Sequence, residues 1–282
     1  MKRSVYLEII DYMQSLGPRC NLHQVAELFP QFSIKTLGSI YSQDYQRKMK
    51  KTHHIHYHPH RIEEYYSRFY TQAQNGCKYV LLKMADEVDL SPALLARLVL
   101  EHHLILADPN GEPPARNVLT QLLKDTTLIE DPVLANEVHT CVVTDDIYGP
   151  LVDTIKHSIG HEYEYLLQRK LEEASMVYLD EDQLRAKGYD KTPDFKLEIP
   201  VAVDGHVVNW IESKASFGDD DSHQTYLKEQ FWSYWNRFGP GLVIYWFGFI
   251  DELDVNREKG ILLMDHFPRD VVTMNPLSVT PS

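Results

Sequence analysis

The sequence has 282 residues with 28 Lys and Arg against 41 Asp and Glu, and its formal net charge at pH 7 is −13. Hydrophobic residues make up 43% of it, which excludes a disordered or collagen-like chain and, at roughly 150 residues per domain, suggests about two globular domains. An acidic chain argues against nucleic-acid binding. However, residues 1–70 carry 10 basic and 6 acidic side chains, so the acidic excess belongs to the last two-thirds of the sequence.

Cysteine usage and hydropathy predict the compartment. The three cysteines, Cys20, Cys77 and Cys141, are widely spaced and form no CxxC pair, which argues against a disulfide framework or a cysteine zinc site. The first residues are too polar for a signal peptide, and no window approaches about 18 consecutive apolar residues. We therefore expect a protein of the nucleus and cytoplasm with no membrane span.

The first half of the sequence has the pattern of short helices joined by turns. Asn21 is placed to cap a short helix, and Ser33 is placed to cap a longer one that begins at Ile34. A similar rhythm recurs near residues 78–103, where Ser91-Pro92 is typical of a helix start. Residues 1–148 are therefore predicted to form an all-helical region with two helix–turn–helix-like units, which bind either nucleic acid or a protein.

From residue 149 onward the pattern changes to α/β. A long helix is predicted over about 151–174, then strands over about 194–203 and 206–215, joined by a two-residue turn at Asp204-Gly205. A helix over about 223–237 and strands over about 241–249 and 261–267 complete the pattern. Residues 149–282 are therefore predicted to form a second, α/β domain.

The strand pair carries the residues best suited to chemistry. Alternation places Trp210, Glu212 and Lys214 on one face of the second strand, and Asp194 precedes the first strand. The hairpin can therefore bring Asp194, Glu212 and Lys214 together. Two adjacent carboxylates repel unless a cation lies between them, and their hard oxygens suit Mg²⁺. The alternative is a solvated ion pair without a catalytic role.

Two helices add candidate residues to this cluster. Glu164 shares a helix face with apolar Leu167, whereas Glu162 lies on a solvated stripe, so we favour Glu164. Gln230 and Tyr234 lie one turn apart on the later helix and can donate hydrogen bonds toward a nucleic-acid backbone or the lysine. The alternative is that this helix only packs on the sheet.

These residues together resemble the PD-(D/E)xK nuclease superfamily. Pro193-Asp194 followed by Glu212-Ser213-Lys214 matches its signature, Tyr163-Glu164 with Leu167 is similar to its helical acid motif, and Gln230 to Tyr234 is similar to its QxxxY element. The resemblance covers about residues 151–270. It implies a restriction-endonuclease-like αβββαβ core after the helical region, with the first strand unassigned.

The resemblance also implies metal-dependent hydrolysis of phosphodiester bonds in DNA or structured nucleic acid. Asp194, Glu212 and the backbone carbonyl of Ser213 would bind Mg²⁺ or Mn²⁺, Lys214 would orient the attacking water, and Glu164, Gln230 and Tyr234 would complete the catalytic set. Many members of this superfamily keep the fold without turnover. The alternative is therefore a silent scaffold that binds and stabilises codanin, the partner implied by what the whole chain, with its helical front end, resembles. We expect a monomer or heteromer.

A basic segment, residues 47–61, ends the helix that begins near Ile34. It is a candidate nucleic-acid contact through Arg47, Lys48, Lys50, Lys51 and Arg61, or simply a solvated helix end. Four alternating histidines in the same segment permit metal binding if the segment is extended, but such a tract is more often a polar loop.

Overall fold

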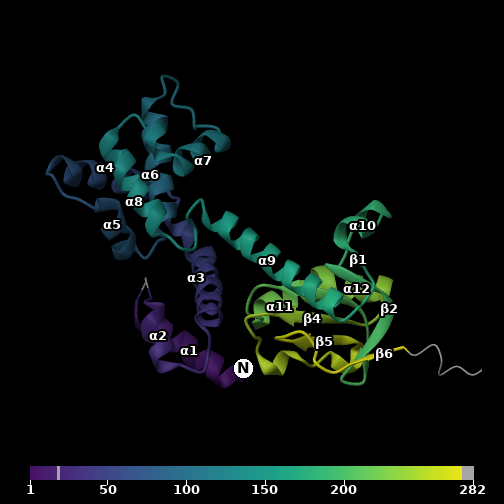
Figure 1. The fold of residues 1–282 in the computed structure, drawn as a ribbon. Coiled ribbons are helices and arrows are strands. Elements are labelled where there is room, and N and C mark those ends of the chain that lie inside the picture. Colours follow the sequence, from purple (N-terminus) through teal and green to yellow (C-terminus); the bar gives the residue numbers. More distant parts are fainter. Residues whose placement is uncertain (18–19, 275–282) are drawn as a thin grey trace, which may run out of the picture. The chain divides into compact units, whose positions relative to one another are not determined.

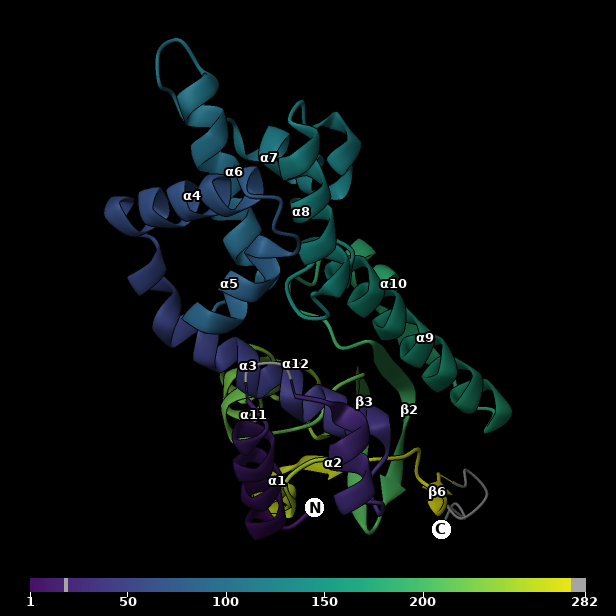
Figure 2. The same cartoon turned by 90° about the vertical axis from the view of Figure 1, so that its left-hand side faces the viewer.

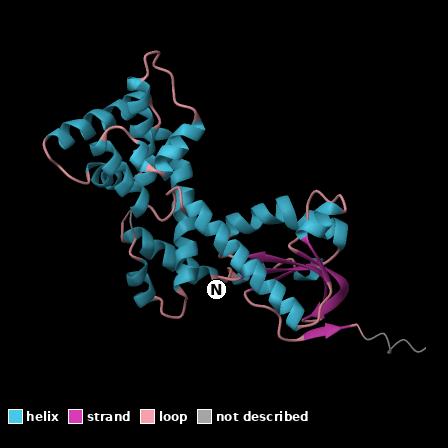
Figure 3. Ribbon diagram, turned by 45° about the horizontal axis from the view of Figure 1, so that its top comes forward, coloured by secondary structure: helices cyan, strands magenta, loops and turns pink. Residues whose placement is uncertain are grey.

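The computed structural model describes residues 1–17 and 20–274, and the chain divides into two compact units (Figure 1). The sheet unit comprises Met1–Ser15, Asn21–Ile40 and Ser158–Ser282, and the helical unit comprises Leu16–Cys20 and Tyr41–His157. All described strands lie in the sheet unit, shown in magenta in Figure 3. The predicted α/β class with a helical N-terminal region is therefore confirmed.

The helical unit is built around one apolar core that includes Phe69, Leu81, Leu95 and Leu134. Its helices are α4 (Pro59–Gln74), α5 (Val80–Val88), α6 (Pro92–Ala107), α7 (Arg116–Lys124) and α8 (Pro132–Thr144), with the 3₁₀ turn η1 (Thr126–Leu128). The long helices α3 (Ile34–His56) and α9 (Val152–Glu173) each contribute residues to both units. As predicted, Asn21, Ser33 and Ser91 accept hydrogen bonds from the backbone at the starts of α2, α3 and α6.

No single helix among the described residues is long and apolar enough to cross a membrane. The pair α5 and α6 passes that test together by length and composition, but it is bent by 116°.

The sheet unit contains five strands in the order β1-β2-β3-β4-β5, and β6 pairs with β2. The strands are β1 (Tyr178–Asp180), β2 (Phe195–Val203), β3 (His206–Lys214), β4 (Gly241–Tyr245), β5 (Ile261–Met264) and β6 (Val271–Thr273). Strands β1, β2 and β3 pair antiparallel, whereas β3, β4 and β5 pair parallel. Along the chain, α9 is followed by β2, β3, β4 and β5 as the sequence predicts, whereas the sequence pattern assigns neither β1 nor β6.

Helices follow and flank these strands. They are α1 (Arg3–Ser15), α2 (Leu22–Leu28), α10 (Glu181–Ala186), α11 (Asp220–Tyr226) and α12 (Trp232–Phe238), with the π-helical segment η2 (Leu227–Phe231) and the 3₁₀ turns η3 (Asp251–Leu253) and η4 (Arg257–Lys259). The single helix predicted over 223–237 is thus α11, η2 and α12 in succession.

The β2–β3 hairpin sets the register of the site. Asp204 and Gly205 have φ values of 50° and 80°, which is the left-handed geometry of a tight hairpin turn. A period of two along β2 would also turn Ile199 inward, but the pairing shifts between Lys196 and Val201, and Ile199 is 55% exposed. Phe195, Leu197, Val201 and Val203 remain buried on both sides of this irregularity, so only Ile199 leaves the core face.

The first helix packs in the sheet unit, where α1 lies beside the segment that follows Phe249 (Figure 2). The ring of Tyr6 stacks on Phe217 at 5.8 Å, and the Arg3 backbone N–H donates to Glu252. The sequence instead suggested a boundary between residues 148 and 149.

Candidate active site

Asp194, Glu212 and Lys214 meet at one end of the β2–β3 hairpin. The backbone N–H of Asp194 donates to Glu212 Oε2 at 3.2 Å, and Asp194 Oδ2 accepts from the backbone N–H of Ser213 at 2.7 Å. These reciprocal bonds tie the start of β2 to the end of β3. Asp194 keeps part of its surface accessible, whereas Glu212 is buried.

Lys214 is held by three partners. Its Nζ donates to Glu212 Oε1 at 2.7 Å and to Gln230 Oε1 at 3.0 Å, and it lies 4.6 Å from the centre of the Tyr226 ring. The ammonium group is thus fixed between the sheet and the π-helical segment. The geometry that the sequence predicted for the three charged residues is therefore present.

Burial and neighbouring charges set the protonation behaviour of the two carboxyls. Burial raises the pKa of Asp194 well above its ordinary value, and the charge of Glu212 raises it further. Burial also raises the pKa of Glu212, although Lys214 opposes this shift. Burial would lower the pKa of Lys214, but the Glu212 and Asp194 charges outweigh it, so the pKa of Lys214 is raised. Lys214 therefore stays protonated beside two carboxyl groups that resist ionisation.

Glu164 approaches this cluster from α9 without contacting it. Its charge adds to the rise in the pKa of Asp194, and its own Oε2 lies 3.1 Å from His161 Nδ1. Leu167, one turn further along, is fully buried in the core under the sheet, while Glu162 is exposed. Glu164 thus lies nearer the site than Glu162 does, as the helix face predicts.

Gln230 and Tyr234 take different places. Gln230 contacts Lys214, whereas Tyr234 is buried, with its ring 5.3 Å from that of Trp210. Burial raises the pKa of the Tyr234 hydroxyl, and the Glu212 and Asp194 charges raise it further. Tyr234 therefore combines packing on the sheet with a neutral hydroxyl near the acids.

Tyr226 is a site residue that the motif reading missed. It ends α11, immediately before η2, and its ring covers Lys214. π-Helical segments are rare and frequently occur at functional sites. The signal was available in the sequence, because Tyr226, Gln230 and Tyr234 recur at four-residue spacing.

A pocket of about 360 Å³ borders the cluster. Gln230 and Tyr234 line one side of it, and Thr192 and the α10 residues Glu181 and Arg185 line another. Glu181 pairs with Arg185 and accepts a hydrogen bond from the Thr192 hydroxyl at 3.2 Å. The pocket gives a ligand access to the side of the site where Gln230 holds Lys214.

The cluster fits a divalent cation in charge and donor type. Ionised Asp194 and Glu212 exceed the charge of Lys214 by one negative charge, and carboxylate oxygens suit Mg²⁺, which usually keeps several water ligands. Among the residues that the structure describes, no group of three or more His, Cys, Asp or Glu side chains is placed to hold a metal. A cation here would therefore rely on two carboxylates, backbone oxygen and water.

The basic segment is partly neutralised within the helical unit. Arg47 pairs with Asp44, Lys48 with Asp89, and Arg61 with Glu64. Lys50 and Lys51 are exposed and have no ion-pair partner among the described residues.

The histidines between residues 54 and 60 do not form one extended face. Helix α3 continues through His56, which is buried and has its Nδ1 2.8 Å from the Tyr65 hydroxyl.

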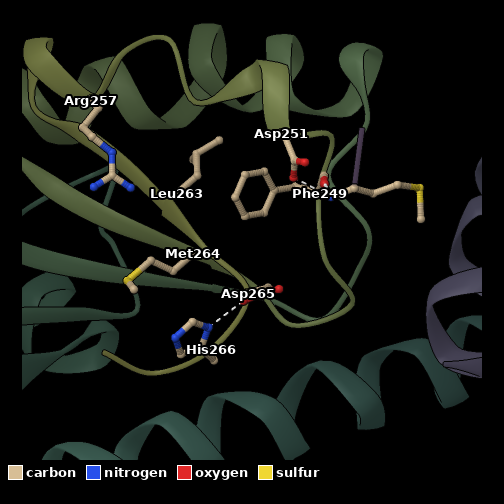
Figure 4. Close-up of a pocket in the computed structure, with 8 residues that line it drawn as sticks. Phe249, Asp251, Arg257, Leu263, Met264, Asp265 and His266 are labelled. Carbon is tan, nitrogen blue, oxygen red and sulfur yellow. Dashed lines mark hydrogen bonds and ion pairs between the residues drawn. The ribbon is translucent and has the colours of Figure 1, made fainter. Parts of the chain in front are cut away.

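A separate pocket of about 200 Å³ contains none of the predicted site residues (Figure 4). Phe249, Asp251, Arg257 and Leu263 are among its lining residues. The Met1 amino group donates to the Phe249 carbonyl and pairs with Asp251 there. This pocket therefore marks the place where α1 is attached to the sheet unit.

Comparison with known proteins adds evidence independent of this geometry. A family model described as "Protein of unknown function TPD sequence-motif" matches residues 130–267, a range that contains Thr192-Pro193-Asp194. No solved structure matches significantly.

Curated relatives match almost the whole chain. The protein named CDAN1-interacting nuclease 1 in Xenopus tropicalis is 57% identical over 276 residues, which covers 97% of this chain and 90% of the relative. Proteins of the same name in Homo sapiens and Gallus gallus are 54% and 49% identical, over 97% of this chain and 98% and 97% of theirs. The chain therefore belongs to the family of CDAN1-interacting nuclease 1 proteins.

Proposed function

We propose that the protein is a metal-dependent nuclease of the PD-(D/E)xK type that hydrolyses phosphodiester bonds in DNA or structured nucleic acid. The observation that carries the proposal is the cluster of Asp194, Glu212 and Lys214, in which Gln230 fixes the lysine. The word nuclease in the names of the relatives supports the same reaction.

Each residue of the cluster has a role that follows from its surroundings. Asp194, Glu212 and the Ser213 carbonyl would hold Mg²⁺ or Mn²⁺, which supplies charge neutralisation and polarisation of the phosphate. Lys214, kept protonated by the two carboxylates, donates a hydrogen bond that orients the attacking water and stabilises negative charge on the phosphate. Gln230 and Tyr226 keep its Nζ in place.

The remaining acid and the pocket complete this assignment. Glu164 lies near enough to act electrostatically on Asp194. We therefore assign it an indirect role in the site, for example through a bridging water. The pocket beside Gln230 and Tyr234 is where the substrate strand reaches the cluster, and Arg185 at its wall can contact a phosphate.

We propose further that the protein acts together with codanin, because the relatives are named for interaction with CDAN1. The acidic excess outside residues 1–70 suits contact with a protein at least as well as contact with a polynucleotide.

The test is cleavage by purified protein of single-stranded, duplex, flapped and branched DNA and of RNA, with Mg²⁺ or Mn²⁺. We expect at least one substrate to be cleaved, and cleavage to fall by about 100-fold or more in Asp194→Asn and Lys214→Met and to stop in EDTA. Glu198→Gln and Lys228→Met remove exposed charges nearby and should leave the rate unchanged.

Equal cleavage by wild type and both site variants would indicate a contaminating nuclease and contradict the assignment. A wild type that cleaves no substrate but binds codanin as well as Asp194→Asn does would favour the silent scaffold.

A further inference from the structure

A third pocket lies entirely within the helical unit, and none of the residues assigned above lines it. It has a volume of about 320 Å³ and opens between α6, α7, the end of α8 and the segment at 148–154. This volume is within the range of small-molecule sites, which begins at about 300 Å³.

The pocket contains two cations without partners in a region that is otherwise acidic. Arg97 is partly buried on α6, and Lys124 is exposed at the last residue of α7. Among the described residues, neither side chain has an ion pair or a hydrogen bond. Residues 71–150 carry only 5 basic side chains against 12 acidic ones, so two unpaired cations at one pocket are unexpected. A partly buried guanidinium without a partner is unfavourable until an anion joins it.

The rest of the lining is apolar and aromatic. Leu94, Leu123 and Val142 supply apolar surface, and the half-buried Tyr148 supplies a ring. The backbone N–H of Tyr148 donates to Asp145 Oδ1 at 2.7 Å, so the segment that carries this ring is fixed. The charges of Arg97 and Glu101 both act on Tyr57, an exposed tyrosine that does not line the pocket.

One carboxylate, Asp153, also lines the pocket. Its charge acts on Lys156, three residues further along the chain. The pocket therefore keeps an excess of positive charge from Arg97 and Lys124.

We propose that this pocket binds a nucleoside phosphate, with the phosphate on Arg97 and Lys124 and the base or sugar against Tyr148 and the leucines. Arg binds phosphate with two parallel hydrogen bonds, and base stacking on a tyrosine is tolerant of sequence. The phosphate belongs either to a free nucleotide or to a nucleic-acid end. An acidic peptide is disfavoured, because one carboxylate would leave the apolar part of the pocket unfilled.

The experiment measures binding to full-length protein that carries Asp194→Asn, so that no ligand is consumed. Binding of dTMP and thymidine is measured by calorimetry. Binding of a 3′-fluorescein trithymidylate, with and without a 5′-phosphate, is measured by fluorescence anisotropy. We compare Arg97→Gln, Arg97→Lys and Lys124→Gln with Arg116→Gln, which makes the same charge change at an exposed residue of α7 outside the pocket. Thermal unfolding checks that each variant is folded.

We expect the phosphorylated probes to bind and the unphosphorylated ones to bind more weakly. Arg97→Gln should weaken binding by about tenfold or more, Arg97→Lys by less, and Arg116→Gln not at all. Binding of dTMP equal to that of the phosphorylated trinucleotide identifies a free-nucleotide site, and binding of the trinucleotide alone identifies a nucleic-acid end.

Three results would overturn the proposal. They are no binding of any phosphorylated probe, equal weakening by Arg97→Gln and Arg116→Gln, or Arg97-dependent binding of a hexaglutamate peptide in the absence of nucleotide binding. None of them bears on the nuclease assignment, which depends on the sheet unit.

Discussion

Two carboxyl groups in the proposed site, Asp194 and Glu212, lower the stability of the metal-free protein. Burial raises the pKa values of Asp194 and Glu212, and the charge of Glu212 raises that of Asp194 further, so ionising both carboxyls opposes folding. One lysine offsets only part of this charge. Under the proposed function, the cluster costs stability in the metal-free protein, and a bound metal ion would offset that cost.

Asp194→Asn should therefore stabilise the protein in EDTA. Between the ordinary and the raised pKa of Asp194 the folded state binds more protons than the unfolded state, so wild-type stability falls as pH rises through that window. At pH 8 we expect the variant to have a free energy of unfolding about 1 kcal/mol higher than the wild type and therefore a higher melting temperature. Its stability should also fall less between pH 5 and pH 8. Exposed Glu198→Gln is the control, and identical melting of wild type and Asp194→Asn at pH 8 would refute this prediction.

His223 should give the opposite pH dependence. It is 1% exposed, its Nδ1 lies 3.1 Å from the Tyr245 hydroxyl, and its Nε2 has no hydrogen-bond partner among residues 1–17 and 20–274. Burial lowers its pKa to about 4, against the opposing charges of Asp220 and Asp254. Because the unfolded state takes up the proton first, stability is lost as pH falls from about 6.5 toward 4, by roughly 2 kcal/mol. Urea unfolding at pH 7 and pH 4.5 should show this loss reduced in His223→Gln, and parallel losses would show that His223 does not contribute.

At the scale of elements, the long periodic segments were predictable and the short ones were not. Apolar residues recur with a period of 3.6 in α9 and of 2 in the β2–β3 hairpin. These periods predict the faces on which Glu164, Glu212 and Lys214 lie. Strand β1 has three half-buried residues and therefore no usable period. The bulge at Ile199 and the π-helical turn after Tyr226 depend on tertiary packing, which local pattern does not record.

The packing of β4 against β3, the strand that carries Glu212 and Lys214, depends on a glycine. Gly241 begins β4 directly against the fully buried Trp210, and a methyl group there would lie 2.0 Å from the indole ring. We expect Gly241→Ala to destabilise the protein by about 2 kcal/mol or more, because the indole has no space to move. Gly160→Ala is the matched control, since no atom apart from its chain neighbours and the backbone of its own helix lies within 4 Å of the added methyl group, and alanine favours a helix interior. Denaturant unfolding of the two variants tests this, and equal stability would contradict the packing argument.

At the scale of the whole molecule, the net charge of −13 is less informative than its distribution. Three of the five basic residues predicted to contact nucleic acid, Arg47, Lys48 and Arg61, pair with acids nearby. This leaves Lys50 and Lys51 for phosphate contact at that segment. The boundary suggested by composition also differs from the compact units. Tyr6 stacks on Phe217 although it lies 211 residues earlier in the chain, so α1 belongs to the sheet unit, and only tertiary structure reveals this contact.

The first helices should therefore be required by the sheet unit. A fragment of residues 149–282 would expose the Phe217 surface and the site of α1, and we expect it to aggregate or melt well below the full chain. Residues 1–40 joined to 158–282 by a flexible Gly/Ser linker should recover a cooperative thermal transition. A fragment 149–282 as stable as the linked chain would refute this division.

The central claim, that Asp194 and Glu212 form the metal centre of a nuclease, is tested most directly by calorimetric titration of Mn²⁺ into the full-length protein at pH 8. The wild type and Glu198→Gln should each bind one Mn²⁺ per molecule, at the same site. The affinity should fall at lower pH as the two carboxyls take up protons. Asp194→Asn should lose this binding. Unchanged Mn²⁺ binding in Asp194→Asn, or none in the wild type, would contradict the assignment.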